Sequence, residues 1–552
     1  MKHRIQLFAT FFATGLCLFF TVGTIPARAG INFWDPTGPL PVCAPAGTWE
    51  NPSWAASSGL TASTGHFTEG SVVVFAAGTV ATCAYTVTAN VNHTVAGIYV
   101  GGVLGAATGN VTINGTGSFT LPSGFDDFSI NSGGSLTISN VLGGSGALTA
   151  QGSGQLYLRG ASTYGGGTFL GYSSGPFTGI IGFNNSASFG VGGICISNTG
   201  AGACALMVDG TSAVTIPNNV TSAGNSAPRV NILANPAGVT FSGNWLLGGN
   251  AKIGASGAAD NLVIISGVMS GSGGLTTFGP GIMCLEGVNT YTGNTVISSG
   301  VLSLALNGSI SDSPSLSIAA GAALDVSGRS APFTLGSGQS FTATGSGTMT
   351  GAVTNVGTST AAVLNGPTNG DVVSLGSQPV ILEFTPARFT GDSIHPSLYV
   401  LQGTLALAGN AFTVTNAAAT PLGAGTYVLI QQATGAISST GTYPVNVAGT
   451  GLAANTSAAI SVTGGTVNLV VQSTAPGPLT VTIPPAYDSH SGTFSVTYIG
   501  SAHLTYTVHT ATNAAGPWTV LGTVTADGSG VIAVTDTPSP ALPACYYWIT
   551  YP

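Results

Sequence analysis

The chain has 552 residues, of which only 4% are charged, and its formal net charge is −8 at pH 7. An ordinary soluble domain has about 25% charged residues, so Ser, Thr, Asn and the backbone must keep this surface in solution. The eight Lys and Arg residues are widely scattered. Because phosphate groups are bound by clustered basic side chains, the composition argues against nucleic acid and anionic lipid surfaces as partners.

The first 29 residues have the pattern of a secretion signal. Lys2 and Arg4 precede an apolar run over residues 5–25, and Ala27 and Ala29 place small side chains where signal peptidase cleaves. We expect residues 1–29 to be removed, leaving five basic against 16 acidic residues, a net charge near −11. The alternative is an uncleaved membrane anchor. The mature protein is expected to be secreted, extracellular or at the cell surface, without a membrane span.

Six cysteines remain after cleavage, and disulfides can form in an exported chain. The candidate pairs are Cys43 with Cys83 and Cys195 with Cys204, and the candidate free or intermolecular thiols are Cys284 and Cys545. If Leu285 points inward, strand alternation turns Cys284 outward. An outward thiol can bridge to a neighbouring molecule, and the alternative is a locally covered cysteine.

Two further regions follow along the chain. Residues 30–120 are strand-like and contain several tryptophans, and residues 121–475 are a long series of glycine-punctuated strands without a sustained helical period. This pattern predicts an all-β solenoid whose coils stack about 4.8 Å apart. Leu, Val, Ile and Ala are expected inside, with Gly and Asn at corners that need a positive φ.

One part of this region is an internal repeat. Residues 144–170 align without a gap on residues 271–297, so that Gly144 falls on Gly271. The first copy shares these residues with the second: Gly144, Leu148, Gly152, Leu158, Gly160, Tyr164, Gly166 and Thr168. What recurs is a set of short strands and tight turns. At about 20 residues per coil, the offset between the copies predicts about six coils.

The second copy contains a recognisable turn. The order N-T-Y-x-G and then G-x-L-x-L is supplied by Asn289, Thr290, Tyr291 and Gly293, followed by Gly300, Leu302 and Leu304. In the context of residues 279–328, this order resembles the autotransporter-associated β-strand repeat of bacterial exported proteins. Residues 403–437 are similar to the closing part of such regions, and residues 33–79 to their start. The resemblance implies a right-handed parallel β-helix displayed outside a Gram-negative cell.

The last region, residues 476–552, has short strands typical of a small antiparallel β-sandwich. It is similar to the immunoglobulin-like or fibronectin-like modules that end many exported repeat proteins. Trp518 is predicted to anchor its core, and sugar stacking is the alternative role. Autotransporters end instead in a membrane barrel of long amphipathic strands. We expect no such barrel here, so self-translocation is not implied.

A search for chemistry finds no convincing site. Asp126 and Asp127 are adjacent, and neighbouring strand residues face opposite sides, so we interpret the pair as a solvated turn. Residues 488–490 read Asp-Ser-His, but a triad needs convergence from separate elements. His503 and His509 are too few for zinc. The sequence predicts a non-enzymatic protein with no catalytic, cofactor or metal site.

The predicted function is an extracellular structural protein that assembles with itself into a fibre, sheath or surface layer. Sparse charge does little to prevent end-to-end pairing of a rod whose ends look uncapped. The first alternative is an adhesin that binds glycans or other cells, and the second is a polysaccharide-acting β-helix enzyme. The expected partners are other copies of the chain, other envelope or extracellular matrix components, and glycans.

Overall fold

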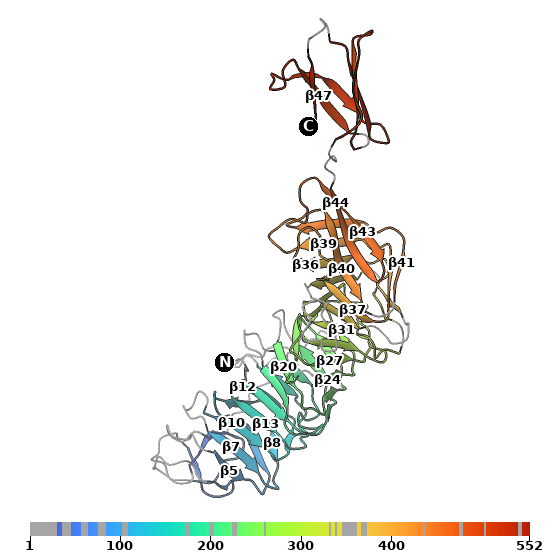
Figure 1. Ribbon diagram of the computed structural model, residues 1–552. Helices are drawn as coiled ribbons and strands as arrows, with labels where there is room; N and C mark the ends of the chain where they lie inside the picture. Colours follow the sequence, from blue (N-terminus) through green and yellow to red (C-terminus); the bar gives the residue numbers. More distant parts are fainter. Residues whose placement is uncertain are drawn as a thin grey trace, which may run out of the picture. The chain divides into compact units, whose positions relative to one another are not determined.

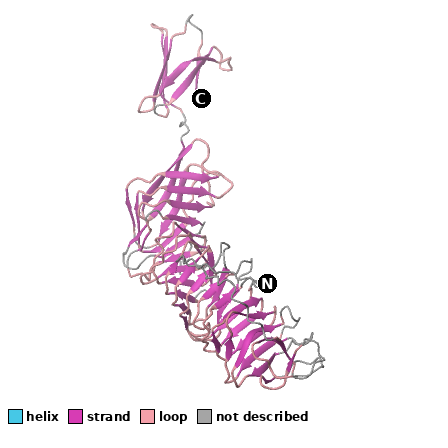
Figure 2. Ribbon diagram, turned by 180° about the vertical axis from the view of Figure 1, so that it is seen from behind, coloured by secondary structure: helices cyan, strands magenta, loops and turns pink. Residues whose placement is uncertain are grey.

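The computed structural model describes residues 30–35, 46–56, 65–75, 84–101, 109–171, 177–197, 204–222, 229–258, 261–330, 333–336, 339–344, 362–365, 372–433, 436–473, 479–501, 504–538 and 544–551 (Figure 1). The expected signal, Cys43, Cys83 and His503 lie outside these residues. Every regular element within them is a β-strand (Figure 2). They include no helix with the length and hydropathy that a bilayer crossing needs.

The chain divides into two compact units. The first unit comprises Met1–Gly451 and Ala458–Val470, and the second comprises Leu452–Ser457 and Val471–Pro552.

The first unit is built from four sheets, numbered here 1 to 4. Sheet 1 contains β1 (Ile31–Trp34), β3 (Trp54–Ala55), β4 (Ser71–Phe75), β6 (His93–Val100), β9 (Phe125–Ile130), β12 (Ala147–Gly152), β14 (Thr168–Leu170), β16 (Ile194–Ile196), β19 (Val220–Ser222), β22 (Trp245–Leu247) and β25 (Met269–Ser270), with β8 (Phe119–Leu121) and β11 (Leu142–Gly144) joined through β6. Sheet 2 contains β2 (Gly47–Thr48), β5 (Ala84–Thr88), β7 (Asn110–Asn114), β10 (Ser135–Ile138), β13 (Gln155–Leu158), β15 (Ile180–Phe183), β17 (Cys204–Val208), β20 (Arg229–Leu233), β23 (Ala251–Ser256), β26 (Leu275–Phe278), β28 (Thr295–Ile297), β30 (Ser315–Ile318), β33 (Ser340–Thr344), β36 (Val380–Phe384), β39 (Phe412–Asn416) and β42 (Val445–Gly449). Sheet 3 contains β18 (Val214–Ile216), β21 (Val239–Phe241), β24 (Leu262–Ile265), β27 (Ile282–Leu285), β29 (Val301–Leu304), β31 (Ala323–Asp325), β34 (Ala362–Asn365), β37 (Leu398–Gln402), β40 (Gly425–Gln432), β44 (Thr466–Ser473) and β43 (Thr456–Thr463), and sheet 4 contains β32 (Phe333–Thr334), β35 (Val372–Ser374), β38 (Thr404–Ala408) and β41 (Ile437–Thr440).

In the middle of the first unit, successive strands visit three sheets in turn, and this repeated cycle is that of a solenoid. From β19 to β27 the chain passes through sheets 1, 2 and 3 and then begins the same cycle again. Each strand pairs in parallel with the strand one coil earlier, as β22 does with β19, β23 with β20 and β24 with β21. The strands therefore stack along the unit (Figure 1). The predicted all-β, parallel-stranded solenoid is confirmed, and its right-handed winding stays a prediction.

The solenoid interior is a continuous column of aliphatic side chains. Leu136, Leu156, Ile181, Leu206 and Ile232 are successive partners on five coils of sheet 2, and none exposes any surface. Burying such a side chain contributes about 1.5–3 kcal/mol. Along each strand, side chains point alternately into and out of the coil. An apolar residue at every second position is therefore enough to form the core, and no long apolar run is needed.

The coils differ in length more than the sequence repeat suggests. Leu285 pairs with Leu304 on the next coil, whereas Leu324 pairs with Leu364, so the chain between the second pair is much longer. The predicted length of about 20 residues therefore fits the coils of the repeat and underestimates the others. The longer coil also contains one more strand, because β32 and β33 lie between β31 and β34, whereas β28 alone lies between β27 and β29 among the described residues.

The two copies of the repeat occupy different faces of the solenoid. Residues 144–170 contain β12 and β14 of sheet 1 and β13 of sheet 2. Residues 271–297 contain β26 and β28 of sheet 2 and β27 of sheet 3. The offset between the copies thus spans five complete coils and one further face. About six coils were predicted. The number is smaller because the coils between the copies are longer than the length assumed from the sequence.

Asparagine stabilises the corners by hydrogen bonding between coils. Among the described residues, the non-glycine positions with positive φ are Leu306 and Asn455, so the predicted left-handed role of corner asparagines is wrong in general. Asn140, 2% exposed, instead donates from Nδ2 to the Gly117 carbonyl at 2.8 Å. Asn235 Nδ2 donates to the carbonyl of Ser212 at 2.8 Å. A short amide side chain satisfies backbone groups that the turn leaves without a strand partner.

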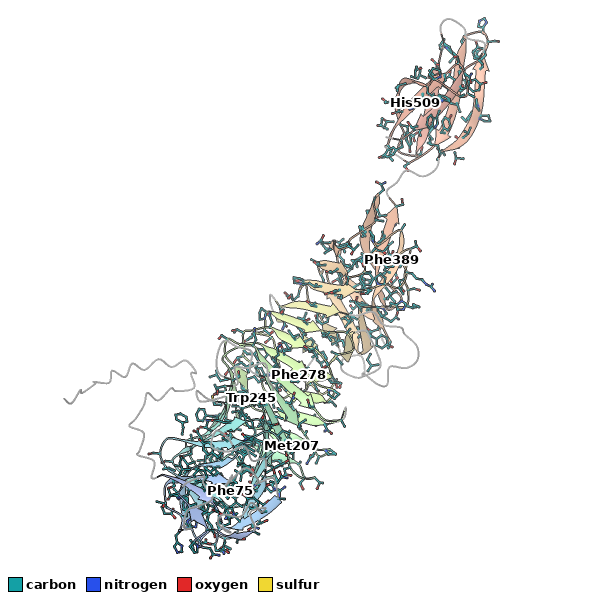
Figure 3. All side chains as sticks on the ribbon, turned by 90° about the vertical axis from the view of Figure 1, so that its left-hand side faces the viewer. Phe75, Met207, Trp245, Phe278, Phe389 and His509 are labelled. Atoms are coloured by element: carbon teal, nitrogen blue, oxygen red, sulfur yellow. The ribbon has the colours of Figure 1, made fainter. Side chains whose placement is uncertain are left out.

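Strands that depart from the parallel pattern lie at the ends of two of the sheets. β3 pairs antiparallel with β1, and Trp34, Trp49 and Trp54 pack there with at most 2% exposure. Phe75, also fully buried, is labelled among the coils that hold this aromatic cluster (Figure 3). At the other end of sheet 3, β43 and β44 are joined by Gly464 and Gly465, both with positive φ, as in a tight hairpin. The expectation of uncapped ends is therefore wrong for the β3 end of sheet 1 and the β43 end of sheet 3, because atypical terminal segments protect solenoid cores there.

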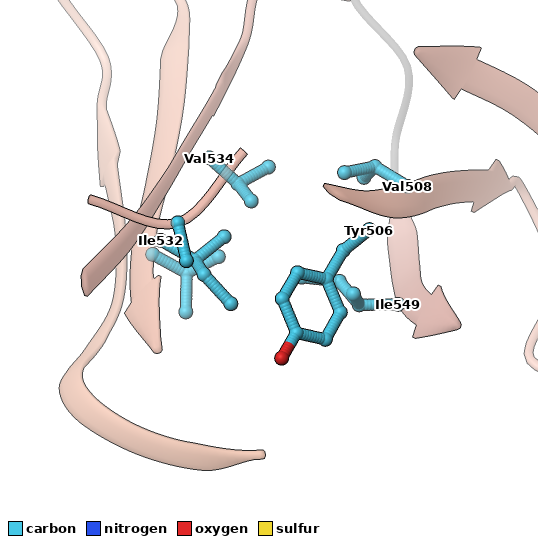
Figure 4. Close-up of a cluster of buried hydrophobic side chains, with 7 residues drawn as sticks. Tyr506, Val508, Ile532, Val534 and Ile549 are labelled. Carbon is cyan, nitrogen blue, oxygen red and sulfur yellow. The ribbon is translucent and has the colours of Figure 1, made fainter. Parts of the chain in front are cut away.

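The second unit contains two antiparallel sheets. Sheet 5 consists of β45 (Thr480–Asp488), β46 (Thr493–Ile499) and β49 (Val531–Asp536), and sheet 6 of β48 (Thr519–Thr525), β47 (Thr505–Ala511) and β50 (Tyr546–Thr550). Both sheets contribute to one buried cluster of Val496, Tyr506, Val508, Ala526, Ile532, Val534 and Ile549 (Figure 4). This shared core fixes which side of each sheet faces outward.

Candidate binding surface

Two residues of the repeat-turn motif, Asn289 and Tyr291, lie in the solenoid interior. Tyr291 is 1% exposed, and its hydroxyl lies 2.6 Å from Thr295 Oγ1. Asn289 Oδ1 accepts a 2.8 Å bond from the backbone N–H of Met269 on the preceding coil, and Thr290 N donates to the Met269 carbonyl at the same distance. Burial raises the pKa of Tyr291. The side chains of Asn289 and Tyr291 are therefore committed to stacking the coils and are not available to a ligand, whereas Thr290 stacks through its backbone and exposes its side chain.

The first copy of the repeat makes the same contacts. The Tyr164 hydroxyl lies 2.6 Å from Thr168 Oγ1, and Leu142 N donates to Ser162 Oγ at 3.2 Å. Ser162 stands where the second copy has Asn289. The repeat therefore conserves a hydrogen-bonded turn, although the two copies lie on different faces.

The cysteines are placed mostly out of solvent contact. Cys195 lies in β16 and Cys204 begins β17, and both are buried, with burial raising the pKa of Cys204 to about 12. The disulfide between them stays a prediction. Cys284 is 7% exposed, and burial followed by the charge of Glu286 raises its pKa to about 11. Cys545 is half-buried, and neither it nor Cys284 has a disulfide partner in the part of the chain that the structure describes.

The adjacent acids lie in a strand. Asp126 and Asp127 belong to β9, and Asp126 is 4% exposed, so their assignment to a solvated turn is wrong. Asp127 accepts a 2.9 Å bond from Gln151 Nε2 and a 3.3 Å bond from the Tyr99 hydroxyl. The two phenylalanines that flank the pair continue the strand alternation, which is why the segment extends through the acids.

The Asp-Ser-His segment at residues 488–490 ends β45 in a turn. Asp488 accepts bonds from the backbone N–H of His490 at 2.9 Å and from Ser491 Oγ at 2.7 Å. This geometry caps the turn and does not align a nucleophile with a base. Within the described ranges no group of three or more His, Cys, Asp or Glu side chains is arranged to hold a metal ion.

One buried carboxylate in the solenoid makes its stability sensitive to acid. Asp392 is 2% exposed; it accepts bonds from His395 Nδ1 at 2.8 Å and from the backbone N–H of Ile394 at 3.2 Å and Ala387 at 2.6 Å. Burial acts to raise its pKa, but these hydrogen bonds outweigh burial and hold the pKa below its ordinary value.

Acid is therefore expected to destabilise the first unit through Asp392. A pKa that is lower in the folded than in the unfolded chain contributes stability that is complete above about pH 4 and is lost as the pH falls through the folded-state value. Urea midpoints measured from pH 6 down to pH 2.5 should fall less steeply for Asp392→Asn than for the natural chain. Equal acid slopes for the two proteins would contradict this role.

The second unit presents a surface of a different kind. We call Trp518, Trp548, His509 and Tyr546 the aromatic face. Trp548 is 53% exposed and Tyr546 42% exposed, and both lie on β50. His509 is the direct partner of Trp548 on the neighbouring strand β47, and Figure 3 labels it on this unit. These side chains lie on the outer side of sheet 6, opposite the buried cluster.

Three rings of the aromatic face, those of Trp518, Trp548 and His509, contact one another. The centroids of Trp518 and Trp548 are 5.8 Å apart, with their planes at 68°, and those of His509 and Trp548 are 5.7 Å apart. His509 Nε2 lies 2.9 Å from Thr550 Oγ1, which holds the imidazole in place. Trp518 is not in the buried cluster, so its predicted role as the core anchor is wrong.

Other residues take the core position. Tyr547, between Tyr546 and Trp548, points to the other side of β50, and its ring stacks on Phe494 at 3.9 Å. The Tyr547 hydroxyl donates to Asp536 Oδ2 at 2.8 Å. Alternation along β50 thus packs one partly buried aromatic ring against the core and exposes the two that flank it.

Comparison with known proteins gives one similarity. Over 214 residues, 37% of this chain, the sequence is 31% identical to the adhesin BmaC autotransporter of Brucella suis biovar 1 (strain 1330). The aligned part is 5% of that protein, so the chain spans a small fraction of the relative's length. No family model matches the chain, and no solved structure matches it. The similarity is consistent with the resemblance to autotransporter passengers.

Proposed function

We propose that the protein is a non-enzymatic adhesin of the bacterial cell surface or extracellular space, in which a β-solenoid supports a binding module. The similarity to an autotransporter adhesin is the observation that carries this proposal. The structure adds a physical rationale. In the repeat motif of the solenoid, Tyr291 and Asn289 are buried and hydrogen-bonded within the stacked coils. The second unit, in contrast, exposes aromatic side chains.

Aromatic exposure on this scale is unusual for a surface that only faces water. Large apolar side chains grouped on a surface mark binding sites, because leaving them hydrated costs free energy that a ligand or partner recovers. Trp548 is the direct strand partner of His509, and Tyr546 lies two residues before Trp548 on the same strand. The second unit is therefore the part of the chain that we assign to binding.

Self-assembly into a fibre has less support. Cys284, one candidate for an intermolecular bond, is 7% exposed, and a buried thiol with a raised pKa is a poor nucleophile for disulfide exchange. One end of sheet 1 is the antiparallel strand β3, and one end of sheet 3 is the β43–β44 hairpin. An assembling protein would instead offer its solenoid ends for continued parallel pairing.

Adherence of protein-coated beads tests the proposal. Beads coated with the full chain, after removal of any signal segment, are expected to bind to bacterial or epithelial cell layers well above beads coated with albumin or with heat-unfolded protein. Protease treatment of intact producing cells should also remove the protein. Binding no higher than albumin, or regular filaments in negative-stain images of non-adherent protein, would overturn an adhesin function in favour of assembly.

A further inference from the structure

We propose that the aromatic face of the second unit is a binding site for neutral polysaccharides. This inference rests on the proposed function and deepens it, because it names the ligand class and the side chains that bind it. Trp548 and Trp518 are the stacking residues, and His509 with Thr550 supplies the adjoining polar contacts.

The ring geometry suits a sugar. A pyranose has an apolar face of C–H groups and a polar rim of hydroxyls, so it stacks on an aromatic ring while hydrogen bonding at its edge. Trp548 exposes 53% of its surface, and Trp518 meets it at 68° with 5.8 Å between centroids. Two indoles at such an angle can contact a sugar on its face and on its side. Because their rings already touch, little side-chain entropy is lost on binding.

Hydroxyl and imidazole groups surround the indoles. Thr507 pairs with both Thr523 and Thr550 across sheet 6, and His509 pairs with Trp548 in the next register position. These threonines share the outward side with Trp548, because the intervening Tyr506 and Val508 are buried. Thr550 Oγ1 already engages His509 Nε2 at 2.9 Å, which fixes the imidazole. The other imidazole nitrogen and the hydroxyls can bond the rim of a sugar.

The charge of this part of the chain selects among glycans. Arg388 is the last basic residue in the sequence, so residues 471–552 contain no Lys or Arg, and their acidic residues are Asp488, Asp527 and Asp536. Anionic sugars and phosphates are bound by Arg and Lys. The aromatic face offers no basic side chain to such ligands, and the net negative charge of residues 471–552 disfavours them, which leaves neutral glycans as the complementary class.

Affinity electrophoresis of the full chain tests the site. Gels containing hydroxyethylcellulose, mannan or dextran are expected to retard the protein, with alginate as the anionic comparison. Trp548→Ala and Trp518→Ala should each weaken binding to the retarding glycan by about tenfold or more, as expected for a central aromatic contact. Tyr487→Ala is the matched control, because Tyr487 is 60% exposed but lies on β45 of sheet 5. It should leave retardation unchanged.

Each variant changes a side chain outside the buried cluster, and its circular dichroism and urea midpoint should match the natural chain. Tryptophan fluorescence of the unaltered protein should also shift on addition of the retarding glycan. The proposal is wrong if none of the three neutral glycans retards the chain, if alginate alone does, or if both tryptophan variants bind normally. A dimer in gel filtration that becomes monomeric on Trp548→Ala would also overturn it, because a second copy would then cover the face.

Failure of this site is distinguishable from failure of the proposed function. Beads that adhere to cells, while the chain binds no neutral glycan, would reject the glycan site and retain the adhesin. Glycan retardation by a chain whose beads do not adhere would support the glycan site and reject the adhesin.

Discussion

Gly166→Ala is expected to destabilise the solenoid by about 3 kcal/mol, whereas the change of its neighbour, Gly165→Ala, should have little effect. A Cβ on Gly166 would lie 2.5 Å from the carbonyl carbon of Gly146 and 2.6 Å from the nitrogen of Ala147, on the preceding coil. Both are backbone atoms, and they cannot move without separating the coils. A Cβ on Gly165 would meet its nearest atom at 4.0 Å.

The pair is a matched test because both residues lie in the same turn. Urea unfolding of the two variants, followed by circular dichroism, should give a clearly lower midpoint for Gly166→Ala alone. The second copy repeats the constraint, since a Cβ on Gly293 would lie 2.3 Å from the nitrogen of Gly274. If Gly166→Ala and Gly165→Ala unfold at the same urea concentration, close coil contact is not why glycine recurs at this position.

Asn218→Ala is expected to cost about 2 kcal/mol of stability, because it leaves buried backbone carbonyls without their donor. Asn218 is 5% exposed, and its Nδ2 donates to the carbonyls of Gly190 at 3.0 Å and Gly192 at 2.6 Å. The exposed Asn184 provides the control, and Asn184→Ala should change the urea midpoint little.

Asn218→Asp separates the hydrogen bond from packing, because it keeps the side-chain shape and removes the amide donor. Only a protonated carboxyl can donate to these carbonyls, so the folded state should raise the pKa of the introduced carboxyl group. The stability of that variant should then be greatest at low pH and fall as the pH rises. A pH-independent variant as stable as the natural chain would show that the amide donor is not needed.

The repeated glycines made much of the solenoid predictable from sequence. The expectation that Leu, Val, Ile and Ala lie inside holds for Leu136 and Leu156, and the offset between the copies identified a stacked array. The change of face between the two copies could not be predicted. Aligning the sequence with itself shows which segments correspond, but it does not show how long the coils between the two copies are. Asparagine does occur at corners, as predicted. A sequence pattern, however, does not show whether an asparagine is there because its backbone has a positive φ or because its side-chain amide bonds a neighbouring coil.

The aromatic face was harder to predict for a local reason. The register between β47 and β48 shifts at His509, where Val520, not Leu521, becomes the partner. Strict alternation counted through such a bulge assigns later residues to the wrong side. Trp518 also lies just before β48, where no strand pairing fixes its direction. The two acids of β9 were misassigned because Asp favours turns on average, whereas the strand partners on both sides determine the local structure.

The rotation of the repeat by one face has a consequence for how such a rod diversifies. If two copies of a segment were separated by a whole number of coils, their equivalent loops would lie above one another on the same face. Here the same turn, around Tyr164 and again around Tyr291, sits on faces that point in different directions. Loops grown from equivalent points of the duplicated sequence would therefore spread around the axis, and duplication alone would give this molecule several sides to vary independently.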